Sequence, residues 1–284
     1  AGLGVEGDLQ MNLAPELAGY AGYRFGLHDA YFQPVYEGIE WVETDAAGKA
    51  MLAPVLPDLG EDAMAPLQAA FTVRVYEGSG RPVERQILRT VLPARPFIGV
   101  KPLFADNALP ENSDARFAVV ALGPNGAPTD LSAHWVLNRV ETRYQWYAIG
   151  GSWNWETVTH RSRIAEGDLA LTASAAAEIG ARVDWGQYEL KIEAVGGDYT
   201  ATSMGFDAGW YAPAGAIDSP DRLSLSLDRP AYRPGDTAKL RLLPQADGFA
   251  VVSVLSNHLI SLQTVAVTAG ENVIELPVTQ EWGA

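Results

Sequence analysis

The chain has 284 residues, a length that fits two average domains or three small β-sandwiches of about 100 residues each. Its 35 acidic and 20 basic residues give a formal charge of −15, and the basic residues form no cluster, so nucleic acids and anionic lipid surfaces are poor partners. Hydrophobic residues make up 48% of the chain and charged residues 19%, which excludes a disordered protein. The absence of cysteine excludes disulfides, thiol catalysis and cysteine metal sites, and no apolar run reaches the roughly 20 residues of a membrane helix.

Alternating hydrophobic and polar residues recur along the whole chain, whereas helical periodicity is nearly absent. A period of two residues is typical of strands with one buried face. The clearest segments are residues 71–76, 116–122, 188–192, 223–227, 239–243 and 273–278. Turns rich in glycine or proline separate them, at residues 78–80, 123–126, 196–198 and 233–236. The pattern predicts an all-β chain of antiparallel sandwiches.

Two proline-containing segments divide the chain. Residues 92–96 (LPARP) suggest an extended joint, and residues 211–216 (YAPAGA) suggest a linker of small residues. They predict three domains, at residues 1–95, 96–215 and 216–284. The last segment offers five strand signals where an immunoglobulin-type sandwich has about seven, so we expect this sandwich to be incomplete.

None of the usual catalytic or ligand-binding motifs has the context that its chemistry needs. Residues 2–7 (GLGVEG) match the dinucleotide-binding fingerprint, but no strand precedes them and no helical pattern follows. The four histidines are widely separated and lack metal-site spacing. Acidic residues are so numerous that choosing any pair as glycosidase carboxylates would be close to chance. We therefore expect no enzyme, no cofactor and no metal, and we assign no catalytic residue.

The sharpest local feature is an aromatic hairpin predicted for residues 143–156. Two aromatic segments flank Gly150 and Gly151, which suit a tight turn. The candidate contact residues of this hairpin are Tyr144, Trp146, Trp153 and Trp155. As an exposed platform they would stack on sugar rings or contact a protein, whereas as packed cross-strand pairs they would stabilise the ribbon itself. We favour the structural interpretation.

Four stretches of sequence, spread over nearly the whole chain, form an ordered set. The first comprises residues 22–27 (GYRFGL), 32–35 and 44–50, and the second residues 81–85 and 97–102 (FIGVKP). The third is the aromatic hairpin with residues 183–190 (VDWGQYEL) and 208–210, and the fourth is residues 227–238 (LDRPAYRPGDTA) with 250–254 and 276–283. In this order they resemble the bacterial alpha-2-macroglobulins.

The resemblance implies tandem macroglobulin-like domains, which are immunoglobulin- or fibronectin-III-like sandwiches, within a larger protease inhibitor. In such an inhibitor a protease cleaves a bait segment, the protein collapses around it, and a thioester can link the two. This chain would then be an internal fragment, with two complete domains at residues 1–95 and 96–215. Residues 216–284 would be the first part of the domain that hosts the bait. The thioester requires a cysteine, which this chain lacks, and the bait would lie beyond Ala284, so no functional residue of the family is placed here.

The resemblance also implies a compartment and partners. The parent protein would be a broad-spectrum endopeptidase inhibitor, anchored as a lipoprotein in the periplasm and acting in bacterial defence against host or competitor proteases. Neighbouring macroglobulin-like domains would contact this segment, and a penicillin-binding protein is left open as a further partner. The alternative function, which the aromatic hairpin motivates, is a carbohydrate- or peptidoglycan-binding surface module.

Overall fold

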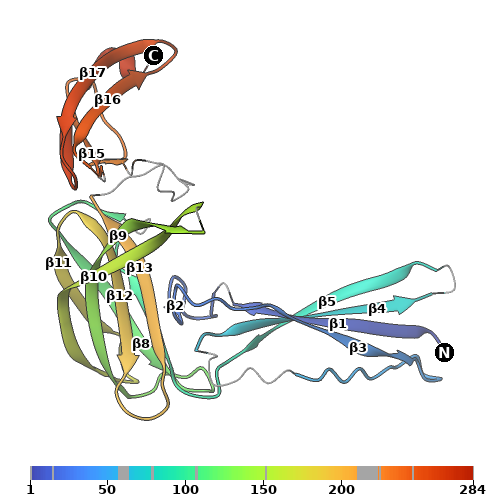
Figure 1. The fold of residues 1–284 in the computed structure, drawn as a ribbon. Coiled ribbons are helices and arrows are strands. Elements are labelled where there is room, and N and C mark those ends of the chain that lie inside the picture. The colour runs from blue at the N-terminus through green and yellow to red at the C-terminus, as the bar shows by residue number, and fades with distance from the viewer. Residues whose placement is uncertain are drawn as a thin grey trace.

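The structure, a computed structural model, describes residues 2–14, 16–56, 64–77, 80–105, 108–150, 152–209, 223, 225–244 and 246–283. For residues 143–146, 149, 152–155 and 157 it describes the backbone alone. This part of the chain forms strands and one short 3₁₀ helix, η1 (Gln280–Gly283), so the all-β prediction is confirmed. None of its helices is long and apolar enough to cross a membrane. The sheets fall into three groups, called here the first, second and third domains (Figure 1).

The described residues of the first domain form one twisted antiparallel sheet. Its strand order is β3 (Val35–Glu43), β1 (Gly4–Leu13), β4 (Leu67–Tyr76) and β5 (Pro82–Val91). Alternation along β1 places Leu9 and Met11 on the buried face, where they pack with Leu67 and Ala69 of β4. The start of β4 and the end of β5 lie nearest the second domain, so the apolar cluster of this sheet lies toward that domain (Figure 1).

The second domain is a sandwich of two sheets. One sheet has the order β11 (Ala177–Val183), β8 (Ser113–Leu122), β6 (Phe97–Pro102) and β2 (Arg24–Phe25). The other has the order β10 (Ser152–Leu171), β9 (Leu131–Ile149), β12 (Gly186–Ala194), β13 (Ala201–Ala208) and β7 (Ala108–Leu109). Phe117 of the first sheet contacts Phe206 of the second at 5.4 Å between ring centroids, and Phe206 stacks on Tyr188 at 5.4 Å. These rings form the centre of the largest apolar core of the described chain.

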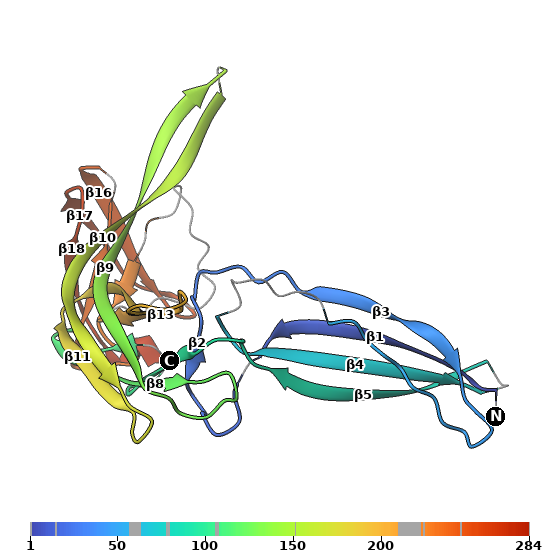
Figure 2. The ribbon, with the colours of Figure 1, turned by 90° about the horizontal axis from the view of Figure 1, so that it is seen from below.

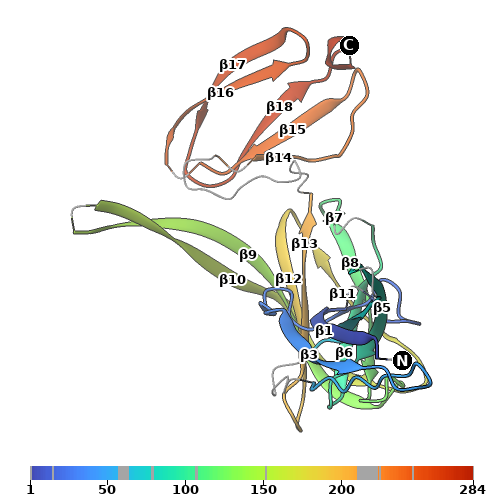
Figure 3. The same ribbon diagram turned by 90° about the vertical axis from the view of Figure 1, so that its right-hand side faces the viewer.

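The predicted aromatic hairpin is the distal part of a much longer one. Strands β9 and β10 pair in register from Leu131 with Leu171 to Ile149 with Ser152, interrupted by one irregularity between Arg163 and Ala165. Strand β12 pairs with β9 only up to Val140. Beyond that point the two long strands pair with each other and with no other strand that the structure describes, and they project from the sandwich as a ribbon (Figure 2 and Figure 3).

The third domain contains all five strands that the sequence predicts for this segment. A sheet of β14 (Leu225–Leu227), β15 (Thr237–Leu242) and β18 (Asn272–Pro277) faces a pair formed by β16 (Gly248–Leu255) and β17 (Leu259–Val267). Ala238, Leu242 and Ile274 are buried in the core of this domain. The outer face of β16 and β17 is apolar and solvent-exposed, with Phe249 78% exposed and Leu262 62% exposed.

Candidate functional site: the two domain junctions

The first junction is made by the backbone. Residues Arg24 and Phe25 belong to the first domain by sequence, yet they form β2 at the edge of a second-domain sheet, with Phe25 opposite Gly99 of β6. On the other sheet, the Ser203 N–H donates a hydrogen bond to the Gly26 carbonyl at 3.1 Å, and the Thr202 hydroxyl donates to the same carbonyl at 3.1 Å. The segment is therefore built into the second domain.

Side-chain packing fixes the same segment. The Phe25 ring contacts the fully buried Phe97 ring at 5.4 Å between centroids, and both belong to one apolar cluster with Leu17 and Leu122. A Cβ atom at Gly99 would lie 2.5 Å from the Phe25 ring, so the opposite strand needs glycine there. The first junction thus combines strand pairing, backbone hydrogen bonds and buried aromatic packing. The domain boundary predicted at residue 95 does not reveal that a segment of the first domain forms a strand of the second.

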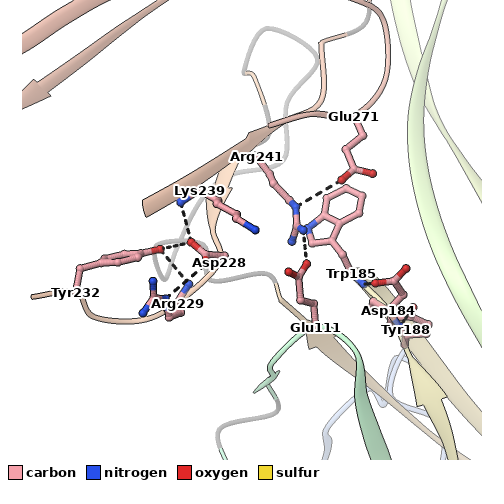
Figure 4. Close-up of polar contacts among 10 residues, drawn as sticks. All are labelled: Glu111, Asp184, Trp185, Tyr188, Asp228, Arg229, Tyr232, Lys239, Arg241 and Glu271. Atoms are coloured by element: carbon pink, nitrogen blue, oxygen red, sulfur yellow. Dashed lines mark hydrogen bonds and ion pairs between the residues drawn. The ribbon is translucent and has the colours of Figure 1, made fainter. Parts of the chain in front are cut away.

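The second junction is made by side chains. Arg241 of β15, in the third domain, has only 8% of its side chain exposed. Its guanidinium donates a hydrogen bond to Glu111 and lies over the ring of Trp185, 5.2 Å from the centroid; both partners belong to the second domain (Figure 4). Its Nε atom is 3.5 Å from a carboxylate oxygen of Glu271, in its own domain. We call these four residues the Arg241 cluster.

The turn between β11 and β12 holds Trp185 in place. The Asp184 carboxylate accepts a hydrogen bond from the backbone N–H of Trp185 at 2.8 Å, and the Tyr188 hydroxyl donates to the backbone carbonyl of Asp184 at 3.0 Å (Figure 4). Burial raises the pKa of Tyr188, so this hydroxyl stays protonated. Arg139 covers the Trp185 ring as well, 5.2 Å from the centroid. Trp185 is thus a fixed surface in contact with two guanidinium groups.

Gly209 leaves the space that the second junction occupies. Its φ of +60° favours glycine, and its N–H donates to the Leu109 carbonyl at 2.6 Å. A Cβ atom at this position would come within 2.9 Å of the Glu111 Cβ and 3.3 Å of Nη1 of Arg241. The residue therefore has a steric role at the junction, which no pattern in the sequence indicates.

The proline- and glycine-rich stretch at residues 227–238 forms a local polar cluster in the third domain. The Tyr232 hydroxyl donates to Asp228 at 2.6 Å, and the Lys239 N–H donates to the same carboxylate oxygen at 2.8 Å (Figure 4). Burial, and then the hydrogen bond with Asp228, raises the pKa of Tyr232 to about 12. Burial alone would raise the pKa of Asp228, but these two hydrogen bonds lower it. The Arg229 guanidinium lies 5.0 Å from the centroid of the Tyr232 ring. Like the Arg241 cluster, this cluster combines an arginine, an aromatic ring and a carboxylate, but all within one domain.

The four residues proposed as a contact surface lie on the distal ribbon. In the backbone register Trp155 is opposite Trp146, Trp153 is opposite Ala148, and Tyr144 is opposite Thr157. Their side chains lie outside the described part of the structure, so their role as a contact surface stays a prediction.

A polar hollow of about 560 Å³ lies between the first-domain segment and the base of the ribbon. Arg161 and Glu189 line it and form an ion pair at 3.0 Å, and burial raises the pKa of Asp207 on the same wall. His28 and Asp29 close the side that the first domain provides. Within the described ranges, no group of three or more histidine or acidic side chains is arranged to hold a metal ion.

Three family models match successive parts of the chain. Residues 1–93 match the bacterial alpha-2-macroglobulin MG5 domain, residues 99–210 match bacterial macroglobulin domain 6, and residues 223–284 match the alpha-2-macroglobulin bait region domain. The Arg241 cluster therefore joins macroglobulin domain 6 to the bait region domain.

Relatives agree with these models. Alpha-2-macroglobulin of Xylella fastidiosa (strain 9a5c) is 29% identical over 234 residues, which are 80% of this chain and 14% of that protein. Alpha-2-macroglobulin of Escherichia coli (strain K12) is 29% identical over 243 residues, 76% of this chain and 14% of that protein. The chain thus spans about one seventh of the length of these relatives.

A solved structure of the native conformation of the E. coli protein has a TM-score of 0.65 at 24% identity, covering 99% of this chain and 19% of that chain. Other solved forms of the E. coli protein are described as trypsin activated and as activated by porcine elastase. With three domain models of one protein matched in order, supported by these relatives, this chain belongs to the bacterial alpha-2-macroglobulins.

Proposed function

We propose that this chain is a structural scaffold segment of a broad-spectrum endopeptidase inhibitor, in which macroglobulin domain 6 carries and orients the bait region domain. The observation that carries this proposal is the contrast between the two junctions. The first contains a shared strand and backbone hydrogen bonds. Across the second, the described residues include no strand pairing and no backbone hydrogen bond.

This contrast fits a protease trap. A rigid pair of domains keeps a third domain in a defined place, while a junction of side chains allows that domain to move when its surroundings change. A bait region has to be presented to proteases before cleavage and to change its environment afterwards. In our proposal the first and second domains form the fixed part, and the third is the part that moves.

Proteases are the proposed partners of the parent protein. The E. coli relatives that are described as activated by trypsin and by porcine elastase support this choice. Placement in the periplasm on a lipid anchor, a role in bacterial defence and a penicillin-binding protein as a further partner rest on the family alone and are proposals. Membrane fractionation of cells that produce the parent protein, followed by globomycin treatment to block lipoprotein processing, tests the anchor.

The proposed function is tested by incubating the parent protein with stoichiometric trypsin or elastase. We expect cleavage at one exposed stretch and loss of protease activity toward a large protein substrate, while hydrolysis of a small peptide substrate continues. The 284-residue chain alone should not inhibit either protease. Stoichiometric inhibition by this chain alone would contradict the scaffold function and indicate a compact inhibitor instead.

The projecting ribbon favours one alternative, a carbohydrate- or peptidoglycan-binding module. A two-stranded arm that pairs with no other described strand is well placed to contact a ligand. Soluble peptidoglycan fragments should then quench tryptophan fluorescence of the chain in a saturable way. If Trp146→Ala and Trp153→Ala abolish such quenching, the alternative is supported; if no quenching is seen with the unchanged chain, it is rejected.

A further inference from the structure

The Arg241 cluster distributes its contacts unequally between the two domains. Arg241 contacts Glu111 and Trp185 of the second domain, but Glu271 belongs to the same domain as Arg241. If the third domain separates from the second, the contacts with Glu111 and Trp185 are lost, whereas Glu271 moves together with Arg241. On the opposite side, Arg139 stays on the Trp185 ring. After separation Arg241 thus keeps an acidic partner, and Trp185 keeps a cationic one.

We propose that the Arg241 cluster is a reversible contact that sets the orientation of the bait region domain on macroglobulin domain 6. It is closed in this structure, and it can open without leaving a buried charge unpaired. Removing one partner of a buried ion pair is strongly destabilising when the other charge stays buried. Separation of the domains instead exposes both charges to water, and Glu271 remains beside the guanidinium. The biological role of this contact rests on the proposed function, whereas the opening and closing of the contact do not.

The closed state is held by part of the hydrogen-bonding capacity of the guanidinium. Its Nη2 atom donates to Glu111, whereas Nε and Nη1 are buried and make no hydrogen bond to the described residues. The contact with Glu271 is an ion pair at 3.5 Å rather than a hydrogen bond. Because a buried donor without an acceptor is unfavourable, this arrangement stabilises the closed state less than a fully bonded arginine would. Such a balance suits a contact that has to open.

Charge predicts opposite effects for the two acidic partners. Arg241 and Glu271 together carry no net charge toward Glu111, so their attraction to it is limited. Replacing Glu271 with Gln leaves a net positive charge facing Glu111 and should favour the closed state. Replacing Glu111 with Gln removes the negative charge on the other side and should favour the open state. A residue that merely supports folding of the third domain would not produce opposite shifts.

A distance measurement between spin labels tests the proposal. The chain has no native cysteine, so labels can be attached at Ala176→Cys in the second domain and Ser261→Cys in the third, both at exposed positions. Electron–electron double resonance should give a narrow distance distribution for the unchanged junction. We expect Glu111→Gln to broaden it at least twofold and Glu271→Gln to leave it as narrow or narrower. Arg241→Lys, which keeps the charge but loses the planar contact with Trp185, should broaden it as well.

Arg229→Gln is the matched control, because Arg229 also lies over an aromatic ring and near two carboxylates, but within the third domain. It should leave the distance distribution unchanged. Thermal unfolding of each variant verifies that both domains remain folded. Equal distributions for the unchanged chain, Glu111→Gln and Arg241→Lys would overturn the proposal, and so would broadening by Glu271→Gln equal to that by Glu111→Gln. These results do not depend on protease inhibition by the parent protein, so failure of the contact and failure of the proposed function are distinguishable.

Discussion

Tyr232 connects the stability of the third domain to pH. Its folded-state pKa of about 12 lies above its ordinary value of 10, so the folded state favours the neutral phenol. The resulting contribution to the free energy of unfolding is complete below pH 10 and is lost as the pH rises toward 12. Tyr232→Phe should remove this part of the alkaline dependence and lower the free energy of unfolding at pH 7 by about 1 kcal/mol. Denaturant titrations at pH 7, 9 and 11 measure both effects.

The control for this prediction is Tyr31→Phe, because Tyr31 is 87% exposed. This variant should reproduce the unchanged chain at all three pH values. A Tyr232→Phe variant whose stability falls with pH as steeply as that of the unchanged chain would show that the tyrosine does not cause the dependence.

Gly209 tests the steric requirement of the second junction. Gly209→Ala forces a side chain into left-handed backbone, which costs about 1–2 kcal/mol, and pushes against Glu111. We expect faster amide exchange at residues 108–112 and a broader label distance between the domains. Gly196→Ala is the matched control, since its φ is +82° and a Cβ atom there would meet nothing within 4 Å. If both variants exchange at the same rate at residues 108–112, the steric argument is wrong.

At the scale of elements, an ion pair ties three strands of the second domain together. Arg161 of β10 reaches across β9 to Glu189 of β12, and the Glu189 side chain is only 12% exposed. Arg161→Leu would leave this carboxylate nearly buried without its cation, so we expect the free energy of unfolding to fall by about 2 kcal/mol. Urea unfolding monitored by far-UV circular dichroism measures the change.

Arg116→Leu is the control at the same scale. Arg116 pairs with Glu178 between β8 and β11, but the two side chains are 64% and 43% exposed. Exposed pairs contribute little, so this variant should stay within about 0.5 kcal/mol of the unchanged chain. A loss for Arg161→Leu no larger than for Arg116→Leu would indicate that water screens the pair at Glu189.

At the scale of the whole molecule, the first junction makes the second domain dependent on the first. A chain of residues 96–209 lacks β2 and Phe25, which leaves the edge of β6 unpaired and Phe97 uncovered. We expect its free energy of unfolding to be about 2–4 kcal/mol lower than that of the same domain in the full chain. A synthetic peptide of residues 14–30, added in excess, should restore part of this loss in a concentration-dependent way. A scrambled peptide should have no effect; equal stability of both chains, or no response to the native peptide, would contradict the dependence.

Much of the architecture was predictable from sequence because one face of each strand is buried. The alternation at residues 71–76 and 188–192 appears in the structure as parts of β4 and β12, and that at residues 273–278 coincides with β18 up to Pro277. In the third domain the same pattern predicts five strands, and the residues that the structure describes there form β14 to β18. The turn at Gly150 of the aromatic hairpin was also predictable, because glycine adopts positive φ angles readily. The observed φ of Gly150 is +61°.

The junctions were not predictable for two physical reasons. Strand β2 has two residues, too few to show a period of two, and its partners on β6 and β13 lie about 75 and 178 residues further along the chain. Arg241 alternates with Leu240 and Leu242, which is the pattern of an ordinary solvent-facing arginine. Arg241 is buried because it contacts Glu111 and Trp185 of the second domain. Trp185 and Gly209 lie within stretches that carry the family resemblance, but a resemblance does not assign their contacts.

The strand shared at the first junction also has a consequence for the order in which the protein folds. During synthesis, residues 24–28 emerge about 175 residues before Thr202 and Ser203, which donate hydrogen bonds to the Gly26 carbonyl. Contacts of such long sequence separation slow folding and prolong the exposure of apolar segments. The segment that contains Phe25 can pair with β6 earlier, but its contacts with Thr202 and Ser203 form only after β13 has been synthesised. A nascent chain arrested before residue 201 should be a preferred client of a holding chaperone, and one released after residue 209 should not.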